Sequence, residues 1–291
     1  MLNVPVTFFY DFTHVDAAGR RFIFHEFAAN GAKHLVLTST LFSNILTDRN
    51  LEDTLREEMS AEGLDFMDAH AMFGKYLDLN CPIEEARGEM LARHKLQLRI
   101  AAAMGVKTIT IHVGNEHVYP EIPLEQQIDA LKRSLDELLP LAEELGIVIC
   151  IENIWLQINT PESLLEVKKA FPTDALGFCY DAGHANLMDK GRYNPESNPN
   201  GVWLGKTPTW DDRILEKMLP HVVNCHLHDN DGVTDMHTNI GRGNVDWEHV
   251  FNLLGQAPQL KVIQSEVSPV YAKVAIKEVC EKFFQWVNPE C

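Results

Sequence analysis

The amino-acid sequence has little positive charge and no concentration of it. Its 291 residues include 25 lysines and arginines against 42 aspartates and glutamates, which gives a formal net charge of −17. No basic run is longer than two residues. A protein that holds a phosphate backbone usually carries a basic face, because neutralising phosphates and releasing counterions supplies most of the affinity. The charge therefore argues against nucleic acid as a partner.

Long apolar runs and closely spaced cysteines are also missing. No apolar run approaches the roughly 20 residues that cross a membrane, and the opening MLNVPVTFFYDFTH lacks the basic and apolar regions of a signal peptide. The six cysteines form no close pair, so a disulfide framework is not expected. We therefore expect a cytoplasmic protein with no membrane segment.

What is present is a repeating pattern of helix, glycine and strand. Four segments end a helix-like run with glycine and then begin an apolar, β-branched run: AANGAKHLVLTS, SAEGLDFMDAH, AAMGVKTITIHVG and EELGIVICIEN. Glycine accepts the left-handed conformation just past a helix end. The predicted strands lie near 5–11, 34–39, 64–70, 107–113, 147–153, 175–181, 221–228 and 261–267. Eight βα units without a GxGxxG fingerprint favour a single (β/α)8 TIM-barrel domain over 1–291 rather than a doubly wound sheet.

Two helices and one loop stand out within this pattern. The apolar stripe Leu124, Ile128, Leu131, Leu135 and Leu138 predicts a helix before Gly146. Thr160 and Pro161 have the residue types of an N-cap and a first helical position, and they open a helix to about Ala170. The segment 189–210, rich in Asn, Pro and Gly, follows strand six, where it forms either a lid over the barrel mouth or a disordered insertion.

Polar side chains gather at the carboxyl ends of the predicted strands, where barrels of this type place their chemistry. They are His70 on strand three, His112 on strand four, Glu152 on strand five, Asp181 and His184 on strand six, His226, His228 and Asp229 on strand seven, and Glu266 on strand eight. Each alone has an ordinary explanation as a hydrogen-bonded residue. Several carboxylates in one low-dielectric mouth, however, repel one another unless they are protonated or joined by a cation. Glu152, Asp181 and Glu266 therefore predict a metal, and His226 completes a ligand set that suits Mn²⁺, Co²⁺, Fe²⁺ or Zn²⁺.

The ordered series IEN, DAGH, HLHD, DMH and GRGNVDW, followed by a late strand glutamate, resembles the xylose isomerase-like barrel superfamily. That superfamily includes sugar and sugar-phosphate isomerases and epimerases, inosose dehydratases and endonuclease IV. The resemblance spans most of the chain, from His70 to Glu266. It implies that Glu152, Asp181, His226 and Glu266 bind the metal, and that the two glutamates act as acid and base on opposite faces of the substrate. It also implies that His184 hydrogen-bonds the substrate, and it favours His226 over His228 as the ligand.

The same residue types suit proton transfer between adjacent carbons of a sugar. Such a reaction needs a base, an acid and a cation that holds the enediolate oxygens. The sequence thus predicts a metal-dependent sugar, sugar-phosphate or inosose isomerase or epimerase that uses Mn, Co or Zn and works through a metal-bound enediolate. Its partner is a small carbohydrate, and a homo-oligomer is compatible with the sequence. Arg242 is either an anchor for an anionic tail of the substrate or an exposed loop residue.

A multi-zinc phosphodiesterase acting on abasic DNA is the alternative. Asp235 and His237 have the Asp-x-His spacing of endonuclease IV, where such a pair joins strand-end histidines in a three-zinc cluster, and His184 matches one of these histidines. Candidates for a second metal or for substrate contacts are therefore His70, His112, His228, Asp235, His237 and Arg242. We favour the small-molecule enzyme because the net charge of −17 opposes a duplex-binding surface. A barrel that binds sugar without converting it is disfavoured because both glutamates are present.

Overall fold

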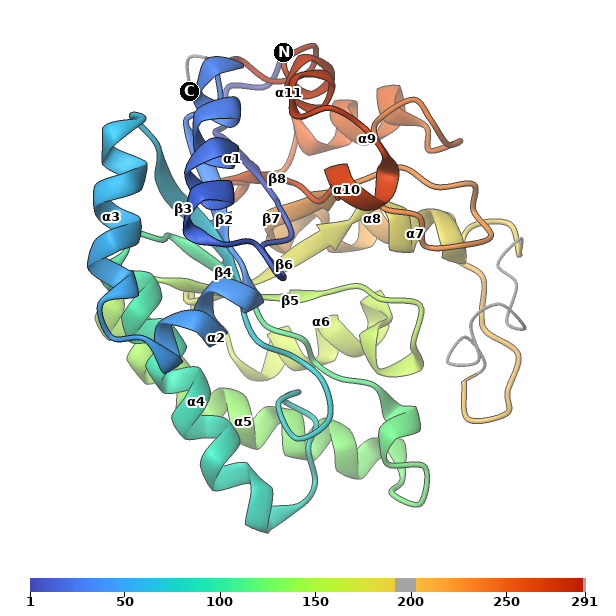
Figure 1. Cartoon of the computed structure of the whole chain (residues 1–291). Coiled ribbons are helices and arrows are strands. Elements are labelled where there is room, and N and C mark those ends of the chain that lie inside the picture. The colour runs from blue at the N-terminus through green and yellow to red at the C-terminus, as the bar shows by residue number, and fades with distance from the viewer. Residues whose placement is uncertain (192–202, 290–291) are drawn as a thin grey trace.

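Eight parallel strands close into a barrel in sequence order, with helices around it (Figure 1). The computed structural model describes residues 1–191 and 203–289. The strands are β1 Val6–Phe8, β2 His34–Leu37, β3 Asp65–His70, β4 Thr108–Thr110, β5 Val148–Glu152, β6 Leu176–Asp181, β7 Val222–Leu227 and β8 Ile263–Ser265. Every strand lies inside its predicted range, so the (β/α)8 prediction is confirmed.

The helices lie in the connections between these strands and after the last one. They are α1 Ala17–Ala29, α2 Ser39–Thr47, α3 Leu51–Ala61, α4 Glu84–Ala103, α5 Leu124–Leu145, α6 Pro161–Ala170, α7 Ala182–Met188, α8 Ile214–Met218, α9 Trp247–Leu254, α10 Pro269–Ala272 and α11 Ile276–Phe283. The two ends of the chain meet, because the backbone of Leu2 bridges to Val287. No helix within 1–191 or 203–289 is both long and apolar enough to cross a membrane.

The local signals for helix ends work as predicted. Helix α5 ends at Gly146, which has a φ of 66° and donates its N–H to the carbonyls of Ala142 and Glu143. A side chain would be strained in this left-handed conformation, and glycine avoids that cost. Helix α6 begins with Thr160 as N-cap, whose hydroxyl accepts from the Ser163 N–H, and with Pro161 at the first helical turn.

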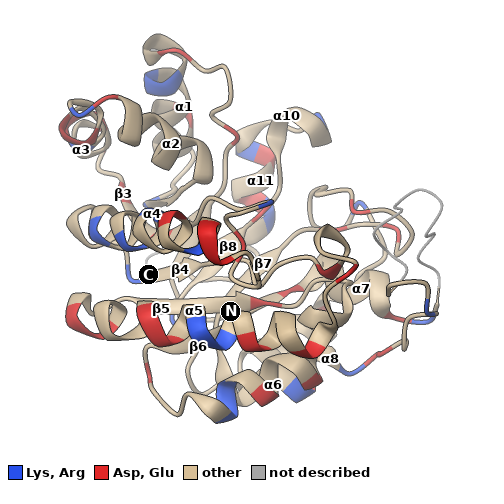
Figure 2. Cartoon of the chain, turned by 90° about the horizontal axis from the view of Figure 1, so that it is seen from below, with Lys and Arg blue, Asp and Glu red and all other residues tan. Residues whose placement is uncertain are grey.

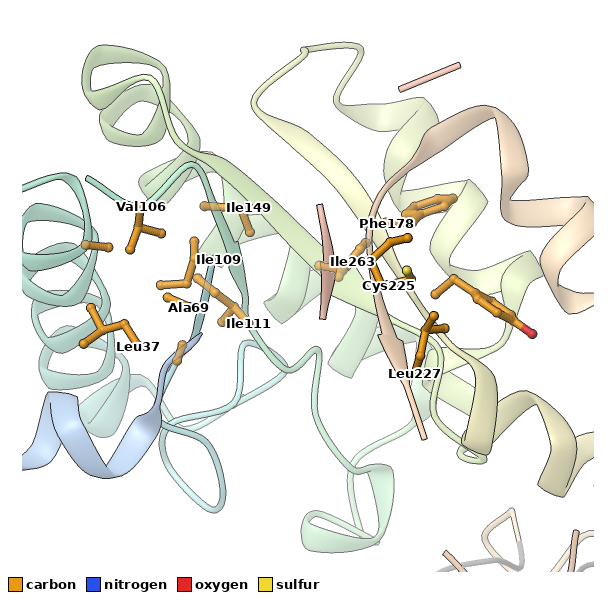
Figure 3. Close-up of a cluster of buried hydrophobic side chains, with 14 of the residues drawn as sticks. Leu37, Ala69, Val106, Ile109, Ile111, Ile149, Phe178, Cys225, Leu227 and Ile263 are labelled. Atoms are coloured by element: carbon orange, nitrogen blue, oxygen red, sulfur yellow. The ribbon is translucent and has the colours of Figure 1, made fainter. Parts of the chain in front are cut away.

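Outward-facing strand side chains form the core between barrel and helices. Ile109 and Ile149 on β4 and β5, and Phe178 and Cys225 on β6 and β7, are completely buried in it (Figure 3). Helices α4, α5 and α6 each contain both acidic and basic residues (Figure 2). Pairs such as Arg93 with Glu89 account for part of this pattern. These helices therefore present no basic stripe for a nucleic acid.

The barrel interior is more polar than the branched apolar packing typical of this architecture. Its buried side chains include Thr7, Asp68, Thr108, Thr110, Asn224 and Gln264. A hydrogen bond from Asn224 on β7 to Asp68 on β3 crosses the interior, because these strands are not neighbours in the barrel. Among the described residues, the five cysteines Cys81, Cys150, Cys179, Cys225 and Cys280 are free and buried, which agrees with the expected lack of disulfides.

The predicted lid at 189–210 falls partly outside the described residues. In its described part, the Trp203 indole N–H donates to the carbonyl of Trp155 at 2.9 Å. This bond ties Trp203 to the β5–α6 connection. The lid itself stays a prediction.

Candidate metal centre

Four side chains from consecutive strands meet at the carboxyl end of the barrel. Glu152 ends β5, Asp181 ends β6, His226 lies in β7 and Glu266 follows β8, and one ligand atom from each lies within 4.8 Å of all the others. The Nδ1 atom of His226 is 3.0 Å from Glu152 Oε1 and 3.3 Å from Glu266 Oε2. The structure therefore brings together the four residues that the sequence indicated as one site.

The carboxylates of this group have buried oxygens without hydrogen bonds from the described residues. These atoms are Oε2 of Glu152, Oδ2 of Asp181 and Oε2 of Glu266. Buried charged oxygens normally have hydrogen-bond partners or coordinate a metal. Three such atoms around one imidazole form a donor set that fits a divalent cation.

The pKa shifts of His226 and Glu266 also favour a bound cation in this group. Burial alone would lower the pKa of His226, but the neighbouring Cys179, Glu266 and Glu152 outweigh it and hold that pKa well above its usual value. Burial alone would raise the pKa of Glu266, but His226 outweighs it and holds that pKa well below its usual value. Without metal, the site thus contains an imidazolium among carboxylates. A divalent ion can take the place of that positive charge.

A second set of ligands adjoins the first through Glu152. It consists of His70 at the end of β3, His112 just beyond β4, and Glu152 itself. His112 Nε2 is 3.5 Å from Glu152 Oε2, and the two imidazole rings are 4.9 Å apart. Burial lowers the pKa of both histidines. Both are therefore neutral at pH 7, which is the form of imidazole that binds metal.

A third set combines one residue of α7 with three residues of the connection between β7 and α9. Its members are His184, His228, Asp235 and His237. Asp235 Oδ2 is 3.0 Å from His237 Nε2 and 3.6 Å from His184 Nε2. His228 stacks on His237 with ring centroids 3.9 Å apart and lies 3.7 Å from Asp235 Oδ1. The structure thus assembles the Asp-x-His pair with two strand-end histidines.

Gly183 in the DAGH motif is required by the position of His228. A Cβ atom at Gly183 would lie 2.0 Å from Cε1 of the His228 ring. The small residue therefore lets the fully buried His228 occupy the space between α7 and the loop that carries Asp235. The DAGH motif shows a glycine at this position, but the sequence alone does not show that this glycine makes room for the His228 ring.

Asp229 holds the loop that carries the third set. Its Oδ1 accepts from the backbone N–H groups of Asn230 and Val245, and its Oδ2 accepts from the Gly241 N–H and the Trp247 indole N–H, at 2.9 to 3.1 Å. The carboxylate is completely buried. These hydrogen bonds fix the path of the chain between β7 and α9. The GRGNVDW motif therefore supplies donors that hold this loop to Asp229.

We expect Asp229→Asn to destabilise the protein by about 3 kcal/mol, because an amide nitrogen would face two of the four donors around this buried side chain. Urea unfolding followed by circular dichroism measures this change. The exposed Asp212 offers a matched control, and Asp212→Asn is expected to change the free energy of unfolding by less than about 0.5 kcal/mol. Equal stability of the two variants would show that Asp229 does not anchor the loop.

The structure does not bring Arg242 to the site. Its guanidinium pairs with Glu278 at 2.8 Å and donates to the carbonyl of Ala272, and it lies outside the lining of the cavity at the barrel mouth. The exposed-loop interpretation of Arg242 is therefore the one that the structure supports. Its partners are 30 and 36 residues away in sequence, so GRG alone could not identify them.

A cavity of about 540 Å³ opens above the ligands. This volume is within the range of small-molecule sites. Glu152, His184, Asp235 and Glu266 are among the residues that line it. Sequence reasoning missed other lining residues, namely Asp11, Phe73, Lys75, Asp78 and Trp155. The two aromatic residues had a signal, because each follows a strand-end ligand by three positions.

Comparisons with known proteins agree with this architecture. Residues 14–266 match the family model described as xylose isomerase-like TIM barrel. An uncharacterised protein of Methanocaldococcus jannaschii is 31% identical over 159 residues, covering 53% of this chain and 48% of that protein, so the chain spans about half the length of this relative. A probable endonuclease 4 of Thermotoga sp. strain RQ2 is 29% identical over 99 residues, covering 34% of this chain and 33% of that protein.

Solved structures extend the likeness over nearly the whole chain. A D-tagatose 3-epimerase-like protein matches with a TM-score of 0.73 and 21% identity, covering 96% of this chain and 95% of that one. The IolI protein with a bound zinc atom matches with a TM-score of 0.69 and 16% identity, covering 97% and 95%. At these identities the structures show the shared fold alone. Together with the match of the family model over most of the sequence, they establish that the chain belongs to the xylose isomerase-like TIM barrel family.

Proposed function

We propose that the protein is a metal-dependent isomerase or epimerase of a small sugar. The observation that carries this proposal is the pair of buried glutamates, Glu152 and Glu266, which belong to one ligand group and both line the cavity. Asp181 and His226 complete a set of three carboxylates and one imidazole. This mixture of donors suits Mn²⁺, Co²⁺ or Zn²⁺.

Each glutamate has a role in moving a proton. When bound, the ion would stabilise the negative charge that develops on a substrate oxygen during proton removal. One glutamate, as the carboxylate, takes the proton from a substrate carbon, and the other, as the protonated carboxylic acid, delivers a proton to that carbon or its neighbour. Both carboxylates keep an oxygen that no described side chain or backbone group hydrogen-bonds.

In this proposal, His184 holds the substrate. Its Nδ1 donates to the carbonyl of Asn153 at 3.0 Å, which fixes the ring, and its Nε2 faces the cavity beside Asp235. Burial alone would lower the pKa of His184, but Asp181 and Asp235 outweigh it and hold that pKa well above its usual value. A protonated His184 can donate a hydrogen bond to a carbonyl or hydroxyl oxygen of the sugar.

The charge of the cavity connects the number of metal ions to the class of substrate. Asp11, Asp78, Glu152, Asp235 and Glu266 line it, together with Asp181 among the ligands. Lys75 is the only lysine or arginine among the described residues of the lining. One divalent ion leaves this set negative, which suits a neutral sugar. Three ions make it positive, which suits a phosphodiester.

A multi-zinc phosphodiesterase is a second candidate because two further ligand sets adjoin the first. The sets around His70 with His112 and around Asp235 with His237 could hold additional ions. In that case the ions, rather than the two glutamates, would supply the chemistry. The net charge of −17 and the mixed charges on the helices oppose the tight binding of a DNA duplex.

Metal content per chain separates the two candidates. We expect elemental analysis of protein purified without chelators or a histidine tag to find one equivalent of manganese, cobalt or zinc. Incubation with ketoses and inososes in D₂O should then place deuterium on the carbon that exchanges its proton. Two to three equivalents of zinc, together with cleavage of a duplex that contains an abasic site, would overturn the proposal in favour of the phosphodiesterase.

A further inference from the structure

A buried hydrogen-bond network lies inside the barrel directly below the metal centre. Its lowest member is Asp68 on β3, which is completely buried. Asp68 Oδ1 accepts from the Thr108 hydroxyl at 2.6 Å, and Asp68 Oδ2 accepts from the Asn224 amide at 3.0 Å. A carboxylate in the interior of a barrel is costly, because burial penalises its charge. The proposed reaction does not use Asp68 directly.

Asn224 has only one orientation in this network. Its Oδ1 accepts from the Cys225 backbone N–H at 2.7 Å, so its Nδ2 must face the other way. The Nδ2 hydrogens are then shared between Asp68 Oδ2 and the hydroxyl oxygen of Thr110, which lies 3.3 Å away. The Asn224 amide thus connects the Asp68 carboxylate to the Thr110 hydroxyl through hydrogen bonds.

Thr110 touches the metal centre from below. Its Oγ1 is 3.2 Å from Nε2 of His226, while Nδ1 of the same ring faces Glu152 and Glu266. A hydroxyl oxygen can accept two hydrogen bonds. Thr110 can therefore accept from both the Asn224 amide and a His226 Nε2–H.

We propose that Asp68, Asn224 and Thr110 form a positioning relay that keeps the hydrogen of His226 on Nε2 and directs the lone pair of Nδ1 to the metal. Metal-binding histidines usually donate their second N–H to a carboxylate, a carbonyl or water. Here a hydroxyl takes that place, and an amide and a carboxylate fix the hydroxyl. This inference rests on the metal-binding part of the proposed function and not on the identity of the reaction.

The test measures metal affinity without any substrate. We expect Thr110→Val, which keeps the side-chain shape and removes the acceptor, to weaken Co²⁺ or Zn²⁺ binding by about 10- to 100-fold in competition with a chelating dye. Thr110→Ser should restore the wild-type affinity. Asp68→Asn should weaken binding as well, because it removes the charge at the base of the relay.

Thr7→Val is the matched control for the same substitution inside the same barrel. Thr7 is completely buried, pairs in register with Gln264, and its hydroxyl has no hydrogen bond within the described residues. Its replacement should leave metal affinity unchanged. Folded Thr110→Val or Asp68→Asn proteins that bind metal as tightly as Thr7→Val would overturn the relay. Wild-type protein that binds metal but converts no sugar would overturn the proposed reaction and leave the relay standing.

Discussion

Glu266→Gln is expected to lower kcat by about 1,000-fold, because the amide can neither take nor return a proton. Glutamine keeps the shape of the side chain, so the fold should persist. Glu266 is the sharper of the two glutamate tests, since Glu152 also belongs to the ligand set around His70 and His112. Glu152→Gln is expected to abolish turnover too, with an additional loss of metal binding at that second set.

The measurement must separate proton transfer from metal binding, because Glu266 is also a candidate ligand. Turnover is therefore measured at metal concentrations that saturate each variant, and circular dichroism checks the fold. Glu278→Gln is the control, since Glu278 pairs with Arg242 outside the cavity and its change should leave kcat unaltered. A metal-saturated Glu266→Gln variant with wild-type kcat would remove Glu266 from the acid and base roles.

The fold could be predicted because its signals are local. Glycine at helix ends, the apolar run at 147–151 and the Thr160–Pro161 cap each depend on residues within a few positions of one another. The barrel then follows from the alternation of strands and helices, because parallel strands need helical crossovers. The same reasoning brought the four candidate ligands together, since every strand of a barrel delivers its last inward side chain to one mouth.

The parts that escaped prediction depend on contacts between distant segments. Asn224 and Asp68 are 156 residues apart, and neither lies in a motif. Which partner an inward side chain meets across the barrel depends on register, which shifts at the bulge between Phe178 and Cys179 on β6. Arg242 illustrates the same limit, because the sequence left it as either an anchor for an anionic tail or an exposed loop residue, and its partner in the structure is the Glu278 carboxylate on α11.

The apparent affinity for metal is expected to rise steeply with pH. The pKa of His226 and that of His184 lie well above the usual value, because neighbouring acidic groups outweigh the effect of burial, and Asp235 raises the pKa of His237 to about 10. A metal must therefore displace protons from imidazolium groups at neutral pH. Each displaced proton changes the affinity about tenfold per pH unit, so one proton gives about 100-fold between pH 6 and pH 8.

The stability of the metal-free protein should also depend on pH, but it should fall as the pH rises. A histidine whose folded pKa is raised stabilises the fold below its unfolded pKa, and this contribution is lost as pH rises through the folded pKa. Metal-free protein therefore loses stability above neutral pH, where metal binds best, and the difference in Tm between metal-loaded and EDTA-treated protein should widen with pH.

Titration calorimetry in two buffers of different ionisation enthalpy counts the protons that metal binding releases. The exposed His25, paired with Glu62, provides the control variant His25→Gln, which should keep the wild-type slope. A metal affinity that stays constant from pH 6 to pH 8 would mean that the metal-free site holds neutral imidazoles. It would contradict the assignment of His226 as an imidazolium beside its neighbouring carboxylates.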